Sequence, residues 1–127
     1  MIVVLDTNFL IYAAKYKIDL IAELNRIFPS NRLLVPTAVI HELEKLKKKS
    51  ASLALTASLA LMILSRLIKE KKIKLVRSGK AADEAIIDIV KNKNVDAVAT
   101  MDKLLAGKIK RLGKAIIKIR QKKYLIS

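Results

Sequence analysis

Short, mainly apolar runs recur along the chain and predict strands. These runs are residues 2–5, 32–35, 73–76, 95–100 and 115–119. Between them, helical spacing of apolar residues predicts helices over 9–16, 18–28, 36–49, 51–71, 78–93 (after an opening turn) and 102–113. Apolar strands that alternate with helices indicate a parallel sheet covered on both faces. Such sheets bind ligands at the carboxyl ends of their strands, where the strand order reverses.

Proline and glycine mark where some of the expected helices begin and end. Pro36 opens a helix, because proline is accommodated at a helix start. Gly113 follows the last expected helix, at the position where helices often end in a left-handed glycine. We therefore expect one domain over residues 1–120, and a basic C-terminal tail with an apolar tip over 121–127.

Composition narrows the class of protein. The chain has 127 residues, of which 53% are hydrophobic and only 4% aromatic, so one domain with a core of Leu, Ile, Val and Ala is expected. Cysteine is absent, which excludes disulfides, thiolate zinc sites, iron–sulfur clusters and cysteine nucleophiles. The start "MIVVLD" has no basic leader, and together these features lead us to expect a cytoplasmic protein.

The longest uncharged run is "SASLALTASLALMILS", residues 50–65. It is shorter than the roughly 20 apolar residues that a membrane span requires, so we expect no membrane segment. A buried helix is the favoured interpretation. It either packs inside a monomer or is shared with a second copy in a homodimer through residues 51–68.

The charge balance is strongly basic. Lys and Arg number 26 against 11 acids, which gives a net charge of +15. A surplus of this size favours a polyanionic partner such as RNA, DNA or an anionic membrane surface. The alternative is that the charge serves solubility or heat adaptation.

Several of the few acids fall where the expected strands end. Asp6 comes directly after the first strand, and Asp102 lies two residues after the fourth. Asp83 and Glu84 lie in the first turn of the helix that follows the third strand, and Glu42 is about two turns into the helix that begins at Pro36. The carboxyl ends of parallel strands share one edge of the sheet, so these acids are expected to meet there.

Each acid also has a purely structural interpretation. Asp6 and Asp102 are favoured residues for capping a helix N-terminus. Asp83 and Glu84 suit the positive end of their helix, and Glu42 can pair with a lysine one turn further on. For each acid alone, the structural interpretation is preferred. For the acids together, it requires four coincidences, because all of them would have to fall at one edge of a very basic chain by chance.

Clustered carboxylates stay ionised together only if positive charge lies among them. Oxygen ligands suit Mg²⁺ or Mn²⁺, and two such ions about 4 Å apart can activate a water and stabilise the leaving oxygen of a phosphodiester. Other chemistries have less support, since His41 is the only histidine and is best interpreted as a helix-surface residue. Gly79 is interpreted as a turn, not as part of a phosphate loop. The few aromatic residues, Phe9, Tyr12, Tyr16 and Tyr124, do not predict a base-stacking platform.

Four segments resemble, in order, the four motifs of PIN-domain nucleases. They are "LDTNFLIY", "VPTAVIHELEKL", "AADEAIIDIV" and "DAVATMDKLL". The resemblance implies an α/β fold, a three-layer α/β/α sandwich around a central parallel sheet, here of five strands, and cleavage of single-stranded RNA with Mg²⁺ or Mn²⁺. It assigns the catalytic and metal-binding role to Asp6, Glu42, Asp83 and Asp102. It assigns supporting hydrogen bonds to Thr7, Asn8 and Thr100.

Within the family, "ELEKL" with "ADE" is more similar to the branch that processes ribosomal RNA in archaea and eukaryotes than to VapBC-type toxins. That branch often has a second Asp where this chain has Glu84, so Glu84 is either a further ligand or only a neighbour of the site. Expected partners are single-stranded RNA and either a ribosomal precursor particle or an antitoxin protein. Lys103 is either a phosphate contact or a solvated lysine. A non-catalytic RNA-binding module with the same fold is the remaining alternative.

Overall fold

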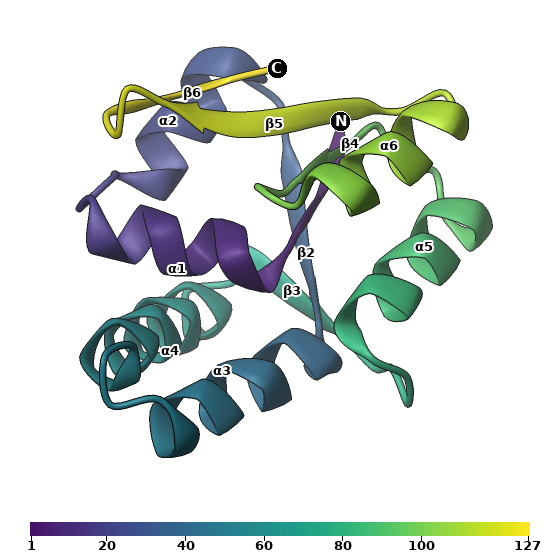
Figure 1. The fold of residues 1–127 in the computed structure, drawn as a ribbon. Helices are drawn as coiled ribbons and strands as arrows, with labels where there is room; N and C mark the ends of the chain where they lie inside the picture. Colours follow the sequence, from purple (N-terminus) through teal and green to yellow (C-terminus); the bar gives the residue numbers. More distant parts are fainter.

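The computed structural model describes residues 1–127 and contains one six-stranded sheet in the order β3-β2-β1-β4-β5-β6 (Figure 1). The strands are β1 (Ile2–Leu5), β2 (Arg32–Pro36), β3 (Ile73–Val76), β4 (Ala97–Ala99), β5 (Ala115–Arg120) and β6 (Tyr124–Ile126). The first five pair in parallel, and only β6 is antiparallel to its neighbour. The expected parallel sheet is confirmed, with one more strand than the five predicted.

Helices cover both faces of this sheet. They are α1 (Thr7–Lys15), α2 (Leu20–Ile27), α3 (Thr37–Lys49), α4 (Ala54–Lys69), α5 (Ala82–Asn92) and α6 (Lys103–Arg111). Figure 1 shows α1, α2 and α4 on one side of the sheet and α5 and α6 on the other. The alternation of side chains in β1 explains the two layers: Val3 and Leu5 belong to the core beneath α1–α4, whereas Val4 belongs to the core beneath α5 and α6. The three-layer α/β/α sandwich is thereby confirmed.

The strand order reverses between β1 and β4. The chain passes from β1 through β2 to β3 on one side, and later continues from β4 to β5 on the other side. Leu5 of β1 is in register with Ala99 of β4, and the Asp6 N–H donates to the Ala99 carbonyl at 3.0 Å. The residues that follow these two strands therefore lie side by side at the switch point, where open α/β sheets bind their ligands.

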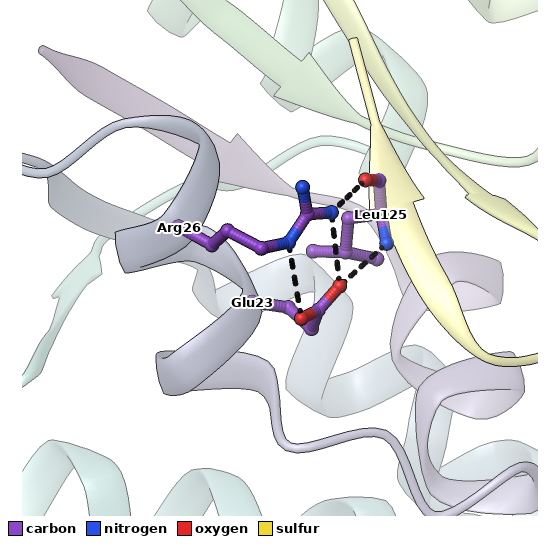
Figure 2. Close-up of polar contacts among 3 residues, drawn as sticks. All are labelled: Glu23, Arg26 and Leu125. Carbon is purple, nitrogen blue, oxygen red and sulfur yellow. Dashed lines mark hydrogen bonds and ion pairs between the residues drawn. The ribbon is translucent and has the colours of Figure 1, made fainter.

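The C-terminal segment is part of the sheet. A basic tail was expected over 121–127, but Tyr124–Ile126 forms β6 and the side chain of Leu125 is fully buried. Its outer edge is covered by α2, as Figure 2 shows: Leu125 N–H donates to Glu23 Oε1 at 3.0 Å, and Arg26 Nη2 donates to the Leu125 carbonyl at 2.6 Å. These two side chains occupy the hydrogen-bonding groups of an edge strand that would otherwise remain open.

Some helix boundaries differ from those expected. The first helix begins at Thr7, not at residue 9, because Asp6 caps it, and α4 begins at Ala54 after a turn over 51–53. Gly113 follows α6 with φ of +79°, which confirms the predicted left-handed helix end. None of the helices combines the length and apolarity needed to cross a membrane.

The inner face of α4 buries small and branched residues, while large apolar side chains remain on its outer face. Leu55 is 84% exposed, Met62 64% and Leu59 37%. Their spacing of four and three residues places them on one stripe of the helix. The monomer therefore buries only part of the apolar surface of this helix.

Candidate functional site

Asp6 lies at the end of β1 and caps α1 while keeping one oxygen for other contacts. Its side chain is only 6% exposed. Oδ1 accepts the Thr7 N–H at 2.8 Å, and Oδ2 accepts the Thr100 hydroxyl at 2.7 Å. The structural interpretation of Asp6 as a cap is therefore correct, and it coexists with a position at the switch point between β1 and β4.

Asp102 has a similar arrangement at the start of α6. Its Oδ1 accepts the N–H groups of Leu104 at 2.9 Å and Leu105 at 3.2 Å. Its own N–H donates to Thr100 Oγ1 at 3.1 Å, and the Thr100 hydroxyl in turn donates to Asp6. Thr100, which is 1% exposed, thus fixes the two loops that carry Asp6 and Asp102 relative to one another.

Asn8 makes a second connection between these loops. Its side-chain oxygen accepts the Met101 N–H at 3.1 Å and lies 3.4 Å from Thr100 Oγ1. The first turn of α1 is therefore attached to the segment that joins β4 to α6. The hydrogen bonds expected of Asn8 and Thr100 are present in the structure.

Glu42 and Asp83 come from α3 and α5, whose N-terminal ends are joined by a pair of hydroxyl residues. Thr37 Oγ1 accepts the Ser78 N–H at 3.0 Å, and Ser78 Oγ accepts the Ala38 N–H at 3.3 Å. The second contact supplies the side-chain cap that Pro36 cannot give to α3. This link sets the start of α3 against the loop that leads into α5.

The predicted carboxylates influence one another's pKa values. Burial raises the pKa of Asp6; hydrogen bonds from Thr100 and the Thr7 N–H lower it, and the charges of Asp102 and Asp83 raise it again. Partial desolvation also raises the pKa of Glu42, and the charges of Asp6 and Asp83 act in the same direction. The sheet edge therefore gathers Asp6, Glu42, Asp83 and Asp102 from four different segments of the chain.

Thr7 presents an unused hydroxyl inside this cluster. Its side chain is 2% exposed, and Oγ1 makes no hydrogen bond within the protein. The hydroxyl nevertheless lies close enough to Glu42 to lower the pKa of that carboxyl group. A buried hydroxyl without a protein partner is uncommon, and the carboxyl group of Glu42 is the acceptor that this one lies beside.

The donor set fits a hydrated divalent cation. All the available donors are oxygens, and the pKa values of Asp6 and Glu42 are raised in part by neighbouring negative charge, which a cation would offset. No three of the acidic or histidine side chains lie close enough to enclose an ion by themselves. Mg²⁺ usually keeps several waters and takes only one or two carboxylates directly, so such a group of three is not a requirement for it.

Three other sequence candidates lie outside this group. Glu84 is exposed, and its charge acts on Lys80; it is not among the groups that shift the pKa of Asp6 or Glu42. Lys103 is exposed at the first position of α6. His41 is exposed on the surface of α3, as expected.

A hollow of about 360 Å³ opens beside Glu42 between α3 and the start of α5. Its lining includes the basic side chains of Lys45 and Lys80 as well as His41. Positively charged lysine side chains therefore lie next to the Glu42 carboxylate on this side of the site.

Sequence reasoning missed the residues that set the elements in place. Thr37 and Ser78 are 41 residues apart, and their contact depends on the pairing of β2 with β3. The only local signal was a hydroxyl residue directly after Pro36, where a capping partner is needed. Met101 contributes through its backbone N–H, for which the side-chain pattern gives no signal.

A model of the PIN-like domain family matches residues 3–122. The chain belongs to this family. The PIN-domain resemblance inferred from the four motifs is thus confirmed, and the match runs from the second residue of β1 past the end of β5.

Two of the similar proteins are named as nucleases. The chain is 36% identical to Ribonuclease VapC4 of Methanocaldococcus jannaschii over 124 residues, which are 96% of this chain and 92% of that protein. It is 26% identical to the PIN-domain endonuclease Utp24, with a TM-score of 0.78 over 98% of this chain and 88% of that one. A domain of functionally unknown protein from M. jannaschii shares the fold at 19% identity, with a TM-score of 0.67 over 94% and 91% of the two chains.

Proposed function

We propose that the protein is a divalent-metal-dependent endoribonuclease that hydrolyses phosphodiester bonds in single-stranded RNA. The observation that carries the proposal is the set of acids at the switch point of a PIN-like fold, where burial, and then neighbouring negative charge, raises the pKa values of Asp6 and Glu42. The relatives named as a ribonuclease and an endonuclease support the same reaction.

The residues that would hold Mg²⁺ or Mn²⁺ are Asp6, Glu42, Asp83 and Asp102. When bound, the metal supplies positive charge for the phosphodiester oxygens and lowers the pKa of a water. Thr100 and the Thr7 N–H orient the Asp6 carboxylate by direct hydrogen bonds. The Thr7 hydroxyl adds a donor inside the cluster, which could orient a water or the Glu42 carboxylate.

Basic side chains near the carboxylates would hold the RNA backbone. Lys45 lines the hollow beside Glu42, and Lys103 begins the helix that Asp102 caps, whereas Lys80 is paired with Asp88. A strand that crosses the cluster is thus flanked by cations, which compensates the repulsion between phosphates and carboxylates. Glu84 remains a candidate outer ligand through its position next to Asp83.

Two cellular roles are proposed. Processing of ribosomal RNA, with a ribosomal precursor particle as partner, is supported by the segments "ELEKL" and "ADE". A toxin neutralised by an antitoxin protein is supported by the similarity to Ribonuclease VapC4. Growth inhibition on expression, relieved by Asp6→Asn, together with a small neighbouring gene, would select the toxin role. For either role, the proposed location is the cytoplasm. The exposed stripe of α4 formed by Leu55, Leu59 and Met62 is proposed as a contact with a second copy of the chain.

The direct test is cleavage of a labelled single-stranded RNA. We expect cutting by the wild-type protein with Mn²⁺, no cutting with EDTA, and a loss of at least about 100-fold for Asp6→Asn, since removal of a group used in the transition state commonly costs 10²- to 10³-fold. The matched control is Asp88→Asn, which neutralises an acid that pairs with Lys80 instead. Equal cutting in EDTA and in Mn²⁺ would exclude the metal-dependent reaction. RNA binding without any cutting would favour the non-catalytic module.

A further inference from the structure

A line of side chains on α1 leads away from the carboxylates. Asn8, Tyr12 and Tyr16 follow one another at intervals of four residues, which places them on one face of the helix. Asn8 is at the site end of this line, where its side chain contacts the loop between Thr100 and Asp102. The line therefore begins beside the acids and extends toward the C-terminus of the helix.

The two tyrosine rings are stacked on one another. Their centroids are 5.9 Å apart and their planes differ by 16°. Four residues of α-helix advance about 6 Å along the axis, so the ring separation equals the helical rise. A third ring that continued this stack beyond Tyr12, at the same spacing, would lie over Asn8.

The far end of the stack is closed by cations and the near end is open. Lys15 and Lys122 each place the ammonium nitrogen 5.5 Å from the centroid of the Tyr16 ring. Lys122 comes from the turn between β5 and β6, so this end of the stack is fixed by a distant part of the chain. Tyr12 has one ring face toward Tyr16, and it is 37% exposed. Its other face is stacked on no second ring, and helical side chains tilt toward the N-terminus, the end at which Asn8 lies.

Asn8 adds an unused donor at this open end. Its oxygen is occupied by the Met101 N–H, which fixes the orientation of the side-chain amide. The amide nitrogen makes no hydrogen bond within the protein and is not enclosed. A flat aromatic face and a free N–H₂ group thus lie one helical turn apart, next to the acids.

We propose that Tyr12 and Asn8 form a base-binding subsite for one nucleotide of a single-stranded RNA. The base stacks on the free face of Tyr12 and continues the Tyr12–Tyr16 stack, while the Asn8 amide donates to an acceptor on the edge of the base. The positive charges of Lys15 and Lys122 keep this path favourable for the phosphate backbone. The proposal rests on the proposed function in one respect, that the ligand is an RNA strand.

Fluorescence of 2-aminopurine tests the subsite without requiring catalysis. A set of 12-nucleotide RNAs carries the probe at successive positions and is mixed with the full chain in EDTA. We expect quenching at one favoured position with the wild-type protein and with Tyr12→Phe, because both have an aromatic face. Tyr12→Leu should abolish this quenching and weaken binding about 5- to 100-fold, the usual effect of losing one base–aromatic stack. Tyr124→Leu, the same change in β6, is the matched control and should bind as the wild type does.

An abasic nucleotide at the favoured position supplies the second arm. It should weaken wild-type binding to the level of Tyr12→Leu and should weaken Tyr12→Leu no further. Wild-type quenching that is absent at every position, or that persists in Tyr12→Leu, would overturn the proposal. Cleavage of RNA in Mn²⁺ is measured separately. If the wild-type protein quenches the probe but does not cleave RNA, the nuclease function is refuted and the base-binding subsite is still supported.

Discussion

At the scale of single residues, Asp6 divides two roles between its two oxygens. One oxygen caps α1 through the Thr7 N–H, and the other accepts the Thr100 hydroxyl within the carboxylate cluster.

The position of Asp6 and Asp102 after adjacent strands was predictable, because the apolar runs that precede them are clear. The hydroxyl pair Thr37 and Ser78 was not, because serine and threonine next to loops are common and only the folded sheet brings these two together.

Removal of the Asp6 charge should stabilise the metal-free protein. Burial raises the pKa of Asp6 above its ordinary value of 3.8, so its ionised form disfavours the folded state. This destabilisation of the folded state is absent at a pH below the unfolded-state pKa of Asp6. It increases as the pH rises from that value through the folded-state pKa. Asp6→Asn should therefore unfold at higher urea concentration at pH 7, by about 1 kcal/mol in unfolding free energy, the scale of a typical single substitution.

The difference in unfolding free energy between Asp6→Asn and the wild type should shrink as the pH falls toward 4. At pH 7, Mn²⁺ should raise the unfolding free energy of the wild type only. Urea titrations at several pH values measure both effects. A difference that stays constant with pH would show that Asp6 is not destabilised by its charge. Asp88→Asn serves again as the control outside the cluster.

At the scale of elements, the strands and helices that carry the acids followed from periodicity, whereas β6 did not. Its segment reads "QKKYLIS" and is dominated by charge at its start, so the apolar tip gave too short a signal for a strand. The strand forms because Leu125 completes the core beneath α1–α4 and because Glu23 and Arg26 occupy its outer edge. Both reasons depend on residues about 100 positions away, which no local pattern contains.

Loss of the Glu23 carboxylate should loosen β6 specifically. The hydrogen bond from Arg26, and then the one from the Leu125 N–H, lower the pKa of Glu23, so the ionised form is the one that holds the edge. In Glu23→Gln the charge-assisted contacts weaken, and the Leu125 amide should exchange with deuterium several-fold faster, while amides of β1 and β4 remain unchanged. Glu44→Gln, an exposed change on α3, provides the comparison. Unaltered exchange at Leu125 would show that packing of its side chain alone holds the strand.

At the scale of the whole molecule, a net charge of +15 surrounds a small acidic edge. The basic surface attracts a polyanion over a long range, and the acids together with their metal would act on it over a short range. The same composition explains why the sequence predicted a polyanionic partner but not its identity. The family assignment supports the proposed reaction class, and the proposed subsite at Asn8 and Tyr12 would give the strand a direction.

RNA binding should depend steeply on salt. Each neutralised phosphate of a single strand contributes about −0.7 to the slope of log K against log salt, so about five contacts give roughly −3.5. Replacement of both Lys45 and Lys103 by Gln should reduce the slope by about 1.4 if each contacts a phosphate. The exposed pair Lys47 and Lys110, changed in the same way, should affect it less. Fluorescence anisotropy at several salt concentrations measures the slope, and binding that is independent of salt would contradict the role of the basic surface.

The central claim is that the four carboxylates form a divalent metal site, and calorimetric titration with Mn²⁺ tests it most directly. We predict saturable binding by the wild-type protein at or below millimolar Mn²⁺, unchanged in Asp88→Asn. Binding should weaken at least about tenfold in Asp6→Asn, since even residues that only support a metal ligand commonly contribute 10- to 100-fold. Absence of saturable binding in the millimolar range, or equal binding by wild type and Asp6→Asn, would contradict the account.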